Sequence, residues 1–222
     1  MLNIIKEEHF RSPIWIMELP EYVEALDKAS DKHIRNAIEH HTKNVINIRN
    51  RELNMNGDYG ASYHSGTLAQ EPAYNSFFDF LINISNQMLD EHGYDLTNYK
   101  TFITEAWVQE FAKDGGGHHT PHLHYNNHVS GFYFLKSSHR TSYPFFVDPR
   151  PAKRMTELPL KSNANISPSL GTIKFNVKPG TLIIFPAYLE HGFTVDNGLD
   201  PFRFFHFNLQ AVQKDIVTFY GK

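Results

Sequence analysis

The hydrophobic pattern changes character about halfway along the chain. In the first hundred residues, apolar side chains recur at helical spacing with charged residues between them. This spacing predicts one helix over Glu21–Glu52 and a second from Phe77 to a stop near Gly93. A short strand is predicted at Ile14–Met17, and the polar stretch between the two helices is predicted to be a loop.

The second half of the chain consists of short apolar runs rich in Phe, Ile and Val, separated by Gly, Pro, Asn and Asp. Such runs predict an antiparallel sandwich or barrel. We therefore expect a mainly β protein with a jelly-roll (double-stranded β-helix, cupin-like) barrel over 101–214. The mostly helical part over 1–100 is expected to pack on one face of this barrel, so that 1–222 form a single domain. The predicted strands are Thr101–Phe111, Val129–Lys136, Phe145–Val147, Gly171–Val177, Thr181–Pro186 and Phe202–Val212.

Composition narrows the classes of function. The 222 residues contain no cysteine, which excludes disulfides, thiolate metal sites and thiol nucleophiles. A formal charge of −3 provides no basic surface for nucleic acid. The sequence has neither a signal peptide nor an apolar stretch of membrane-spanning length, so we expect a cytoplasmic protein.

Five of the 14 histidines lie in the eleven residues 118–128. His122 and His124 are two residues apart, so on a strand their rings would point to one face. His191 follows the predicted strand Thr181–Pro186 and would complete the site from another part of the barrel. Isolated histidines elsewhere are expected to be ordinary surface residues. Imidazoles that meet on one face and leave coordination positions open favour iron over a closed zinc site.

Arg203 lies twelve residues after His191, at the start of an aromatic strand. A guanidinium in this position is able to pair with a carboxylate several ångströms from the metal. We predict that it binds the far carboxylate of 2-oxoglutarate, whose other end would chelate the iron. The competing interpretation is a surface arginine whose stem packs on aromatic rings.

Four segments resemble a known family in order and spacing. They are the H-x-H pair followed by Ser130–Phe134, the turn Phe145–Pro151, the segment Pro179–Phe193, and the strand Phe202–Asn208. Together they resemble the 2-oxoglutarate/Fe(II)-dependent oxygenases found in bacteria and in phages of marine cyanobacteria, over about Trp107–Asn208. The resemblance implies a jelly-roll hydroxylase with Fe(II) and 2-oxoglutarate as cofactors, and a phage-encoded protein expressed in a bacterial host would fit it.

Carried over by position, the resemblance makes His122 and His191 iron ligands. His124 occupies the position of the superfamily's carboxylate ligand. The third ligand is therefore either His124, which the H-x-H spacing favours, or Asp148 in the turn before Pro149.

The resemblance also makes Arg203 the cosubstrate anchor. Tyr133, on the strand after the H-x-H pair, and Gln109, two residues after Trp107, are further candidates for contact with the cosubstrate. For Tyr133 a plain role in the hydrophobic core is an equal alternative. The superfamily's arginine is usually followed two residues later by serine, and here Phe205 stands there. We assign no catalytic residue beyond the metal ligands.

The predicted reaction is hydroxylation of a substrate by O₂, with decarboxylation of 2-oxoglutarate to succinate. One alternative is a cupin-type metal enzyme that does not use 2-oxoglutarate, although cupins usually place Glu a few residues after the pair, where Tyr125, Asn126 and Asn127 stand. The other is a non-catalytic jelly-roll binding module. The sequence indicates neither the primary substrate nor the oligomeric state.

Overall fold

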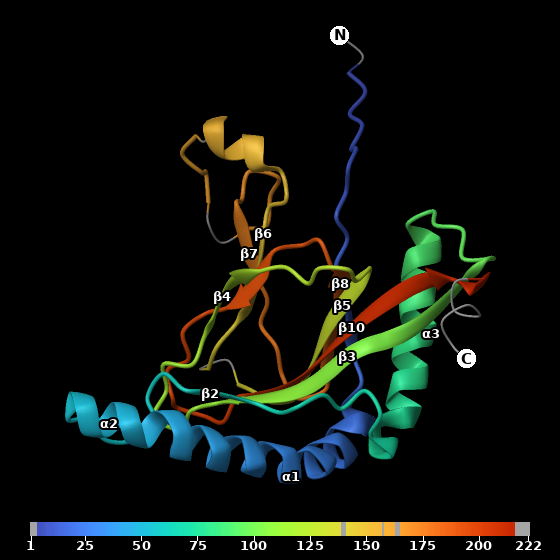
Figure 1. Cartoon of the computed structure of the whole chain (residues 1–222). Helices are drawn as coiled ribbons and strands as arrows, with labels where there is room; N and C mark the ends of the chain where they lie inside the picture. The colour runs from blue at the N-terminus through green and yellow to red at the C-terminus, as the bar shows by residue number, and fades with distance from the viewer. Residues whose placement is uncertain (1–3, 139–140, 157, 163–164, 216–222) are drawn as a thin grey trace.

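The computed structural model describes residues 4–138, 141–156, 158–162 and 165–215. The strand β1 (Trp15–Glu18) and a 3-10 turn at Pro20–Tyr22 lead into α1 (Val23–His41). A π-helical turn, Thr42–Ile46, joins α1 to α2 (Asn47–Leu53), and the helix ends at a residue in the left-handed conformation. The long predicted helix is thus confirmed as one helical rod, drawn along the lower edge in Figure 1.

The second predicted helix is confirmed as α3 (Asn75–Glu91), preceded by a 3-10 turn at Pro72–Tyr74. Its last turn is followed by Gly93, which has a φ of 87°. A glycine reaches this left-handed conformation without the steric cost that a Cβ would add, so the chain turns sharply there. Figure 1 shows α3 standing beside the barrel, while α1 passes beneath it.

The β-strands form two antiparallel sheets that face one another, as in a jelly roll. The first sheet has the order β1-β8-β5-β10-β3-β2, and the second has the order β4-β9-β6-β7. Beyond β1, the strands are β2 (Ser62–His64), β3 (Tyr99–Phe111), β4 (His119–His122), β5 (Val129–Lys136), β6 (Pro144–Val147), β7 (Thr172–Lys174), β8 (Thr181–Pro186), β9 (His191–Phe193) and β10 (Arg203–Gln213).

Each face of the first sheet is buried against a different layer. The helices pack on its outer face, where strand residues such as Tyr133, Phe205 and Phe207 join side chains from α1 and α3. On the inner face, Phe132, Phe204 and their neighbours pack against the second sheet. Because side chains alternate along a strand, adjacent residues of β5 and β10 belong to different cores. The expected fold, with helices on one face of the barrel, is confirmed.

The structure corrects three details. The stretch predicted as a loop contains β2, whose residues pair with the end of β3. Two strands of the second sheet, β4 and β9, are only four and three residues long and were not predicted. The strand predicted at Gly171–Val177 is limited to Thr172–Lys174. No helix in the described part of the chain is long and apolar enough to cross a membrane.

Candidate metal centre

Three histidine rings meet between the two sheets. The strands β4 and β9 pair so that His122 lies directly opposite His191. His124 lies two residues beyond the end of β4, and its ring centroid is 5.1 Å from that of His122 and 5.1 Å from that of His191. One ring nitrogen from each histidine lies within 4.8 Å of the other two. Nitrogens that bind one ion from the same side at a metal–nitrogen distance of about 2.1 Å are separated by about 3.0–3.4 Å. The three rings would therefore move together by about 1–2 Å to share a metal.

Backbone carbonyls orient two of these rings. The Nδ1 of His122 donates to the carbonyl of Thr120 at 2.8 Å, and the Nδ1 of His191 donates to the carbonyl of Leu189 at 2.8 Å. A carbonyl only accepts, so the proton of each ring lies on Nδ1 and the lone pair on Nε2. The Nε2 atoms of His124 and His191 are buried and have no hydrogen-bond partner. Buried nitrogens without partners are costly, and a shared metal ion would satisfy them.

The surroundings keep the imidazoles of His124 and His191 neutral. Burial first, and then the neighbouring rings of His122 and His124, lower the pKa of His191 to about 3, although the hydrogen bond to Leu189 opposes this shift. Burial and the nearby His122 lower the pKa of His124 to about 4. A metal ion requires deprotonated imidazole. At neutral pH the rings of His124 and His191 are therefore neutral, which is the ionisation state that a metal ligand requires.

The prediction for Arg203 is wrong in this structure. Its side chain is on the outer face of β10, where its Nε donates to Glu110 at 2.6 Å and its Nη1 donates to Asp27 at 2.7 Å and to Asp31 at 2.8 Å. Although burial alone would lower the pKa of this guanidinium, hydrogen bonds and charge pairing with the carboxylates keep it raised. Arg203 thus connects β10 with α1 and β3, and it faces away from the three histidines.

The other two cosubstrate candidates, Tyr133 and Gln109, lie on opposite faces of the first sheet. Tyr133 also lies on the helix side of the sheet, where its hydroxyl donates to the carbonyl of Leu19 at 2.6 Å. The expectation that it contacts the cosubstrate is therefore wrong. Gln109 is buried on the inner face, and its amide nitrogen contacts the Oγ of Ser62 and the Nε2 of His119. Of the three candidates, Gln109 is the one that borders the histidine cluster.

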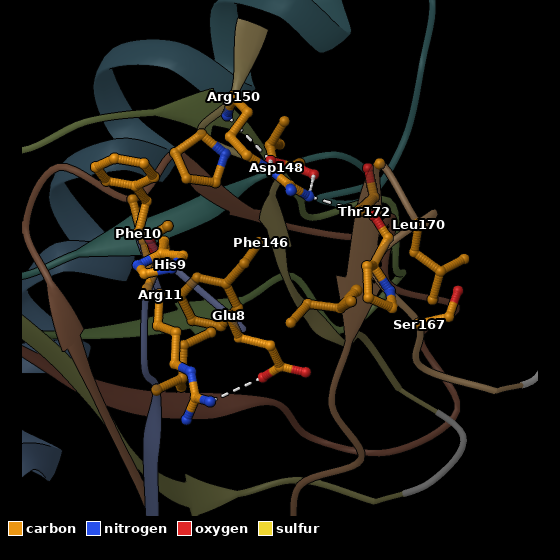
Figure 2. Close-up of a pocket in the computed structure, with 18 of the residues that line it drawn as sticks. Glu8, His9, Phe10, Arg11, Phe146, Asp148, Arg150, Ser167, Leu170 and Thr172 are labelled. Carbon is orange, nitrogen blue, oxygen red and sulfur yellow. Dashed lines mark hydrogen bonds and ion pairs between the residues drawn. The ribbon is translucent and has the colours of Figure 1, made fainter. Parts of the chain in front are cut away.

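Asp148 does not join the three histidines. Its carboxylate accepts hydrogen bonds from Arg150 and Lys153, and the bond from Arg150 is the main reason that its pKa lies well below the usual range. It lies beside a groove of about 490 Å³ between the N-terminal segment and the β6–β7 region (Figure 2). Phe146 lines this groove, and its ring centroid lies 6.1 Å from that of His191. The alternative in which Asp148 is the third ligand is therefore not supported.

The sequence interpretation missed several inward-facing polar residues around His124. His206 is buried on β10, with its ring centroid 4.6 Å from that of His124 and 4.1 Å from that of Trp107. Asn208, two residues further on, contacts both His124 and His206. The alternation of β10 places Phe204, His206 and Asn208 on one face, and this pattern was the signal that could have identified them.

Comparison with known proteins agrees with this architecture. Residues 105–208, which contain all three histidines, match the model of the family described as "Putative 2OG-Fe(II) oxygenase". No curated protein matched the chain.

Several solved structures share the fold. AviO1 from Streptomyces viridochromogenes Tue57 has a TM-score of 0.57 at 11% identity, covering 90% of each chain. A prolyl-4-hydroxylase from Pseudomonas putida has a TM-score of 0.52 at 10% identity, covering 89% of this chain and 92% of its own. SnoN, a non-haem α-ketoglutarate-dependent epimerase from nogalamycin biosynthesis, has a TM-score of 0.50 at 12% identity, covering 89% of this chain and 78% of its own.

The family match includes the strands that bring the histidines together, and the solved structures share the barrel. Residues 105–208 of this chain are therefore similar to the 2OG-Fe(II) oxygenase family, a match that indicates Fe(II) and 2-oxoglutarate as cofactors.

Proposed function

We propose that this protein is an Fe(II)/2-oxoglutarate-dependent dioxygenase that hydroxylates a substrate and that His122, His124 and His191 hold its iron. The observation that carries the proposal is the convergence of three ring nitrogens within 4.8 Å in a segment that matches the family. Three imidazoles without a carboxylate leave the full positive charge of Fe(II) to attract an anionic cosubstrate.

The chain contributes orientation and exclusion of water. The carbonyls of Thr120 and Leu189 direct the Nε2 atoms of His122 and His191 toward the site. The aromatic rings of Phe132 and Phe185 cover His191, with centroids 5.4 Å and 4.6 Å away. In the proposed reaction, iron with 2-oxoglutarate would direct one oxygen atom of O₂ into the substrate and the other into succinate, with release of CO₂.

The three histidines are suited to hold a metal ion, whereas Arg203 does not face them as the predicted anchor for 2-oxoglutarate would. Within the described part of the chain, Arg203 is the one fully buried cation, and it faces the helices. The inner face at the start of β10 carries Phe204, and Phe202 immediately precedes the strand; both pack on Phe193, at 4.5 Å and 5.6 Å between centroids respectively. We propose Gln109 as the remaining cosubstrate contact, because its carboxamide is on the inner face and is able to bind a carboxylate through neutral hydrogen bonds.

The central test compares His191→Ala with the parent protein. The parent should bind one equivalent of Fe(II) under anaerobic conditions and convert 2-oxoglutarate slowly to succinate in air, even without a primary substrate. His191→Ala should lose both properties, because it removes one of three ligands. His40→Ala is the matched control, since this histidine is exposed on α1 and far from the site in sequence. Equal iron binding and succinate formation by His191→Ala and the parent would contradict the proposal.

Because Arg203 faces the helices and not the three histidines, we consider a second candidate, a metal enzyme that does not use 2-oxoglutarate. Titration of 2-oxoglutarate into the anaerobic Fe(II) protein separates the two. Chelation by the keto acid should produce a weak visible absorption band that saturates at one equivalent. An Fe(II) protein with no such band at any concentration of 2-oxoglutarate would favour the second candidate.

A further inference from the structure

Asn208 is at the centre of a hydrogen-bonded network that runs from Glu105, which is exposed, to the candidate ligand His124. Its side chain is fully buried on the inner face of β10. The Oδ1 accepts a hydrogen bond from the Oγ of Ser130 at 2.7 Å and lies 3.2 Å from the Nε2 of His206. The Nδ2 donates to the carboxylate of Glu105 at 3.0 Å and lies 3.2 Å from the Nδ1 of His124. One amide therefore contacts four side chains.

The chemistry of Glu105 determines which way this amide points. A carboxylate has only acceptors, so the NH₂ group of Asn208 must face it. Ser130 and His206 impose no such constraint, because a hydroxyl and a neutral imidazole are each able to donate or accept. The same NH₂ group also faces the Nδ1 of His124. That nitrogen must then accept, so the ring proton of His124 lies on Nε2.

The three imidazoles are thus held in two different tautomers. His122 and His191 donate from Nδ1 to carbonyls and leave Nε2 free to bind a metal. In His124 the network puts the proton on Nε2, which is buried without a partner. A histidine binds a metal through Nε2 only when that atom carries the lone pair. As the amide is now oriented, His124 is not ready to be a ligand.

We propose that Glu105, acting through Asn208, opposes metal binding by His124 and that the amide must turn over when the site is loaded. This inference rests on the proposed metal site. In the turned state, Oδ1 accepts from the Nδ1 of His124, and Nδ2 donates to Ser130 and His206. His206 is able to follow because its Nδ1 is buried without a partner and takes up the proton that leaves its Nε2. Only Glu105, which would then face the amide oxygen, opposes the turn. Glu105 is therefore a positioning residue and not a ligand.

Glu105→Gln tests this proposal because two physical effects predict opposite results. If Glu105 acted only through its charge, its removal would weaken the binding of a cation. In our proposal the substitution tightens binding, since the new carboxamide is able to donate to the turned Oδ1 of Asn208. We expect Co(II) alone, titrated and followed by visible absorption, to bind Glu105→Gln roughly tenfold more tightly than the parent, within the range known for residues behind a metal ligand. Equal or weaker binding would overturn the proposal.

The His124→Ala background provides the matched control. His124→Ala should bind Co(II) more weakly, because one of three ligands is missing, and its affinity is read at higher Co(II) concentration. Without this imidazole the orientation of the amide no longer affects a ligand, so adding Glu105→Gln to this background should not tighten Co(II) binding. The same gain in both backgrounds would show that Glu105 acts in another way and would overturn the proposal.

Imidazole ¹⁵N NMR of the metal-free parent measures directly which nitrogen of each histidine ring carries the proton. We expect the proton on Nε2 in His124 and on Nδ1 in His191. A proton on Nδ1 of His124 would refute the proposed tautomer even if Co(II) bound normally. A parent protein that bound no Co(II) while showing the expected tautomers would refute the metal site instead, so the two failures are distinguishable.

Discussion

At the scale of single residues, hydrogen-bond partners decide what each side chain is able to do. The three histidines lie close together, but two face carbonyls and the third faces an amide whose polarity is set by Glu105. Arg203 has the chemistry to bind a carboxylate and already binds three of them from the protein itself. Residue type alone would not have separated these roles.

Arg203→Met should lower the stability of the fold and leave the metal site intact. The guanidinium is 5% exposed, and its loss would leave the carboxylates of Glu110, Asp27 and Asp31 without their shared cation. Removing one partner of a buried ion pair costs about 3–5 kcal/mol, and the partial exposure of Asp27 and Asp31 favours the lower end. Urea denaturation measures the loss, with Lys28→Met, an exposed position on α1, as the control. A large loss of Co(II) or 2-oxoglutarate affinity with unchanged stability would show that our correction for Arg203 is mistaken.

At the scale of secondary-structure elements, strand pairing and alternation bring the site together. The pairing of β4 with β9 places His122 opposite His191, although 68 residues separate them in the chain (191 − 122 − 1). The strand β10 carries His206 and Asn208 inward and Arg203 outward. Both faces of β10 are buried, so the alternation shows that His206 and Asn208 share a face opposite to Arg203, but burial does not indicate which face is nearer the metal site.

The central strand β5 depends on a glycine. Gly131 lies beside Phe207 of β10, and a Cβ at this position would come within 2.4 Å of the phenyl ring and 2.8 Å of the carbonyl oxygen of Ile183. Gly131→Ala should therefore destabilise the fold by about 1–3 kcal/mol, the usual cost of overpacking. Thermal or urea unfolding measures this effect. Gly171→Ala, where a Cβ meets no atom within 4 Å, is the control and should be close to neutral. Equal effects of the two substitutions would contradict the packing argument.

At the scale of the whole molecule, the first sheet contributes side chains to two hydrophobic cores, one on each face. Its outer face joins the helices in one apolar cluster, and its inner face joins the second sheet in another that is largely phenyl rings. The histidines lie at the border of the inner cluster, where Phe132 packs against His191 and Phe193 packs against the neighbouring His119. The fold thereby keeps several imidazoles neutral in one place.

This burial predicts how the stability of the metal-free protein depends on pH. The pKa is lowered to about 3 in His191 and to about 4 in His124, first by burial, whereas the unfolded chain has values near 6.5. Between these limits the unfolded state binds more protons than the folded state, so stability falls as the pH falls from about 6.5 toward 4. Each imidazole whose pKa is lowered in this way changes the free energy of unfolding by up to about 1.4 kcal/mol per pH unit in that window.

Urea midpoints between pH 7 and pH 4.5, measured in the presence of a chelator, test this dependence. The slope should decrease in His191→Ala, which no longer has that imidazole to protonate. An unchanged slope in this variant would mean that other groups cause the loss. His40→Ala, at an exposed position, should retain the slope of the parent.

The sequence by itself predicted most of the secondary-structure elements and the three histidines that meet in the fold. Periodicity at helical spacing predicted α1 and α3, apolar runs between turn residues predicted most of the barrel, and the H-x-H pair with His191 identified the residues that meet. These features are local or depend on residue chemistry that does not change with context. The short strands β2, β4 and β9 were missed because three or four residues contain too little pattern.

Only the tertiary structure decided which way the side chains face. Arg203 and Tyr133 point to the helices, while His206 and Asn208 point to the histidines, because a strand buried on both sides has the same hydrophobic pattern in either orientation. The partners that give an imidazole its tautomer also come from distant strands. Orientation and protonation therefore follow from contacts that no local stretch of sequence contains.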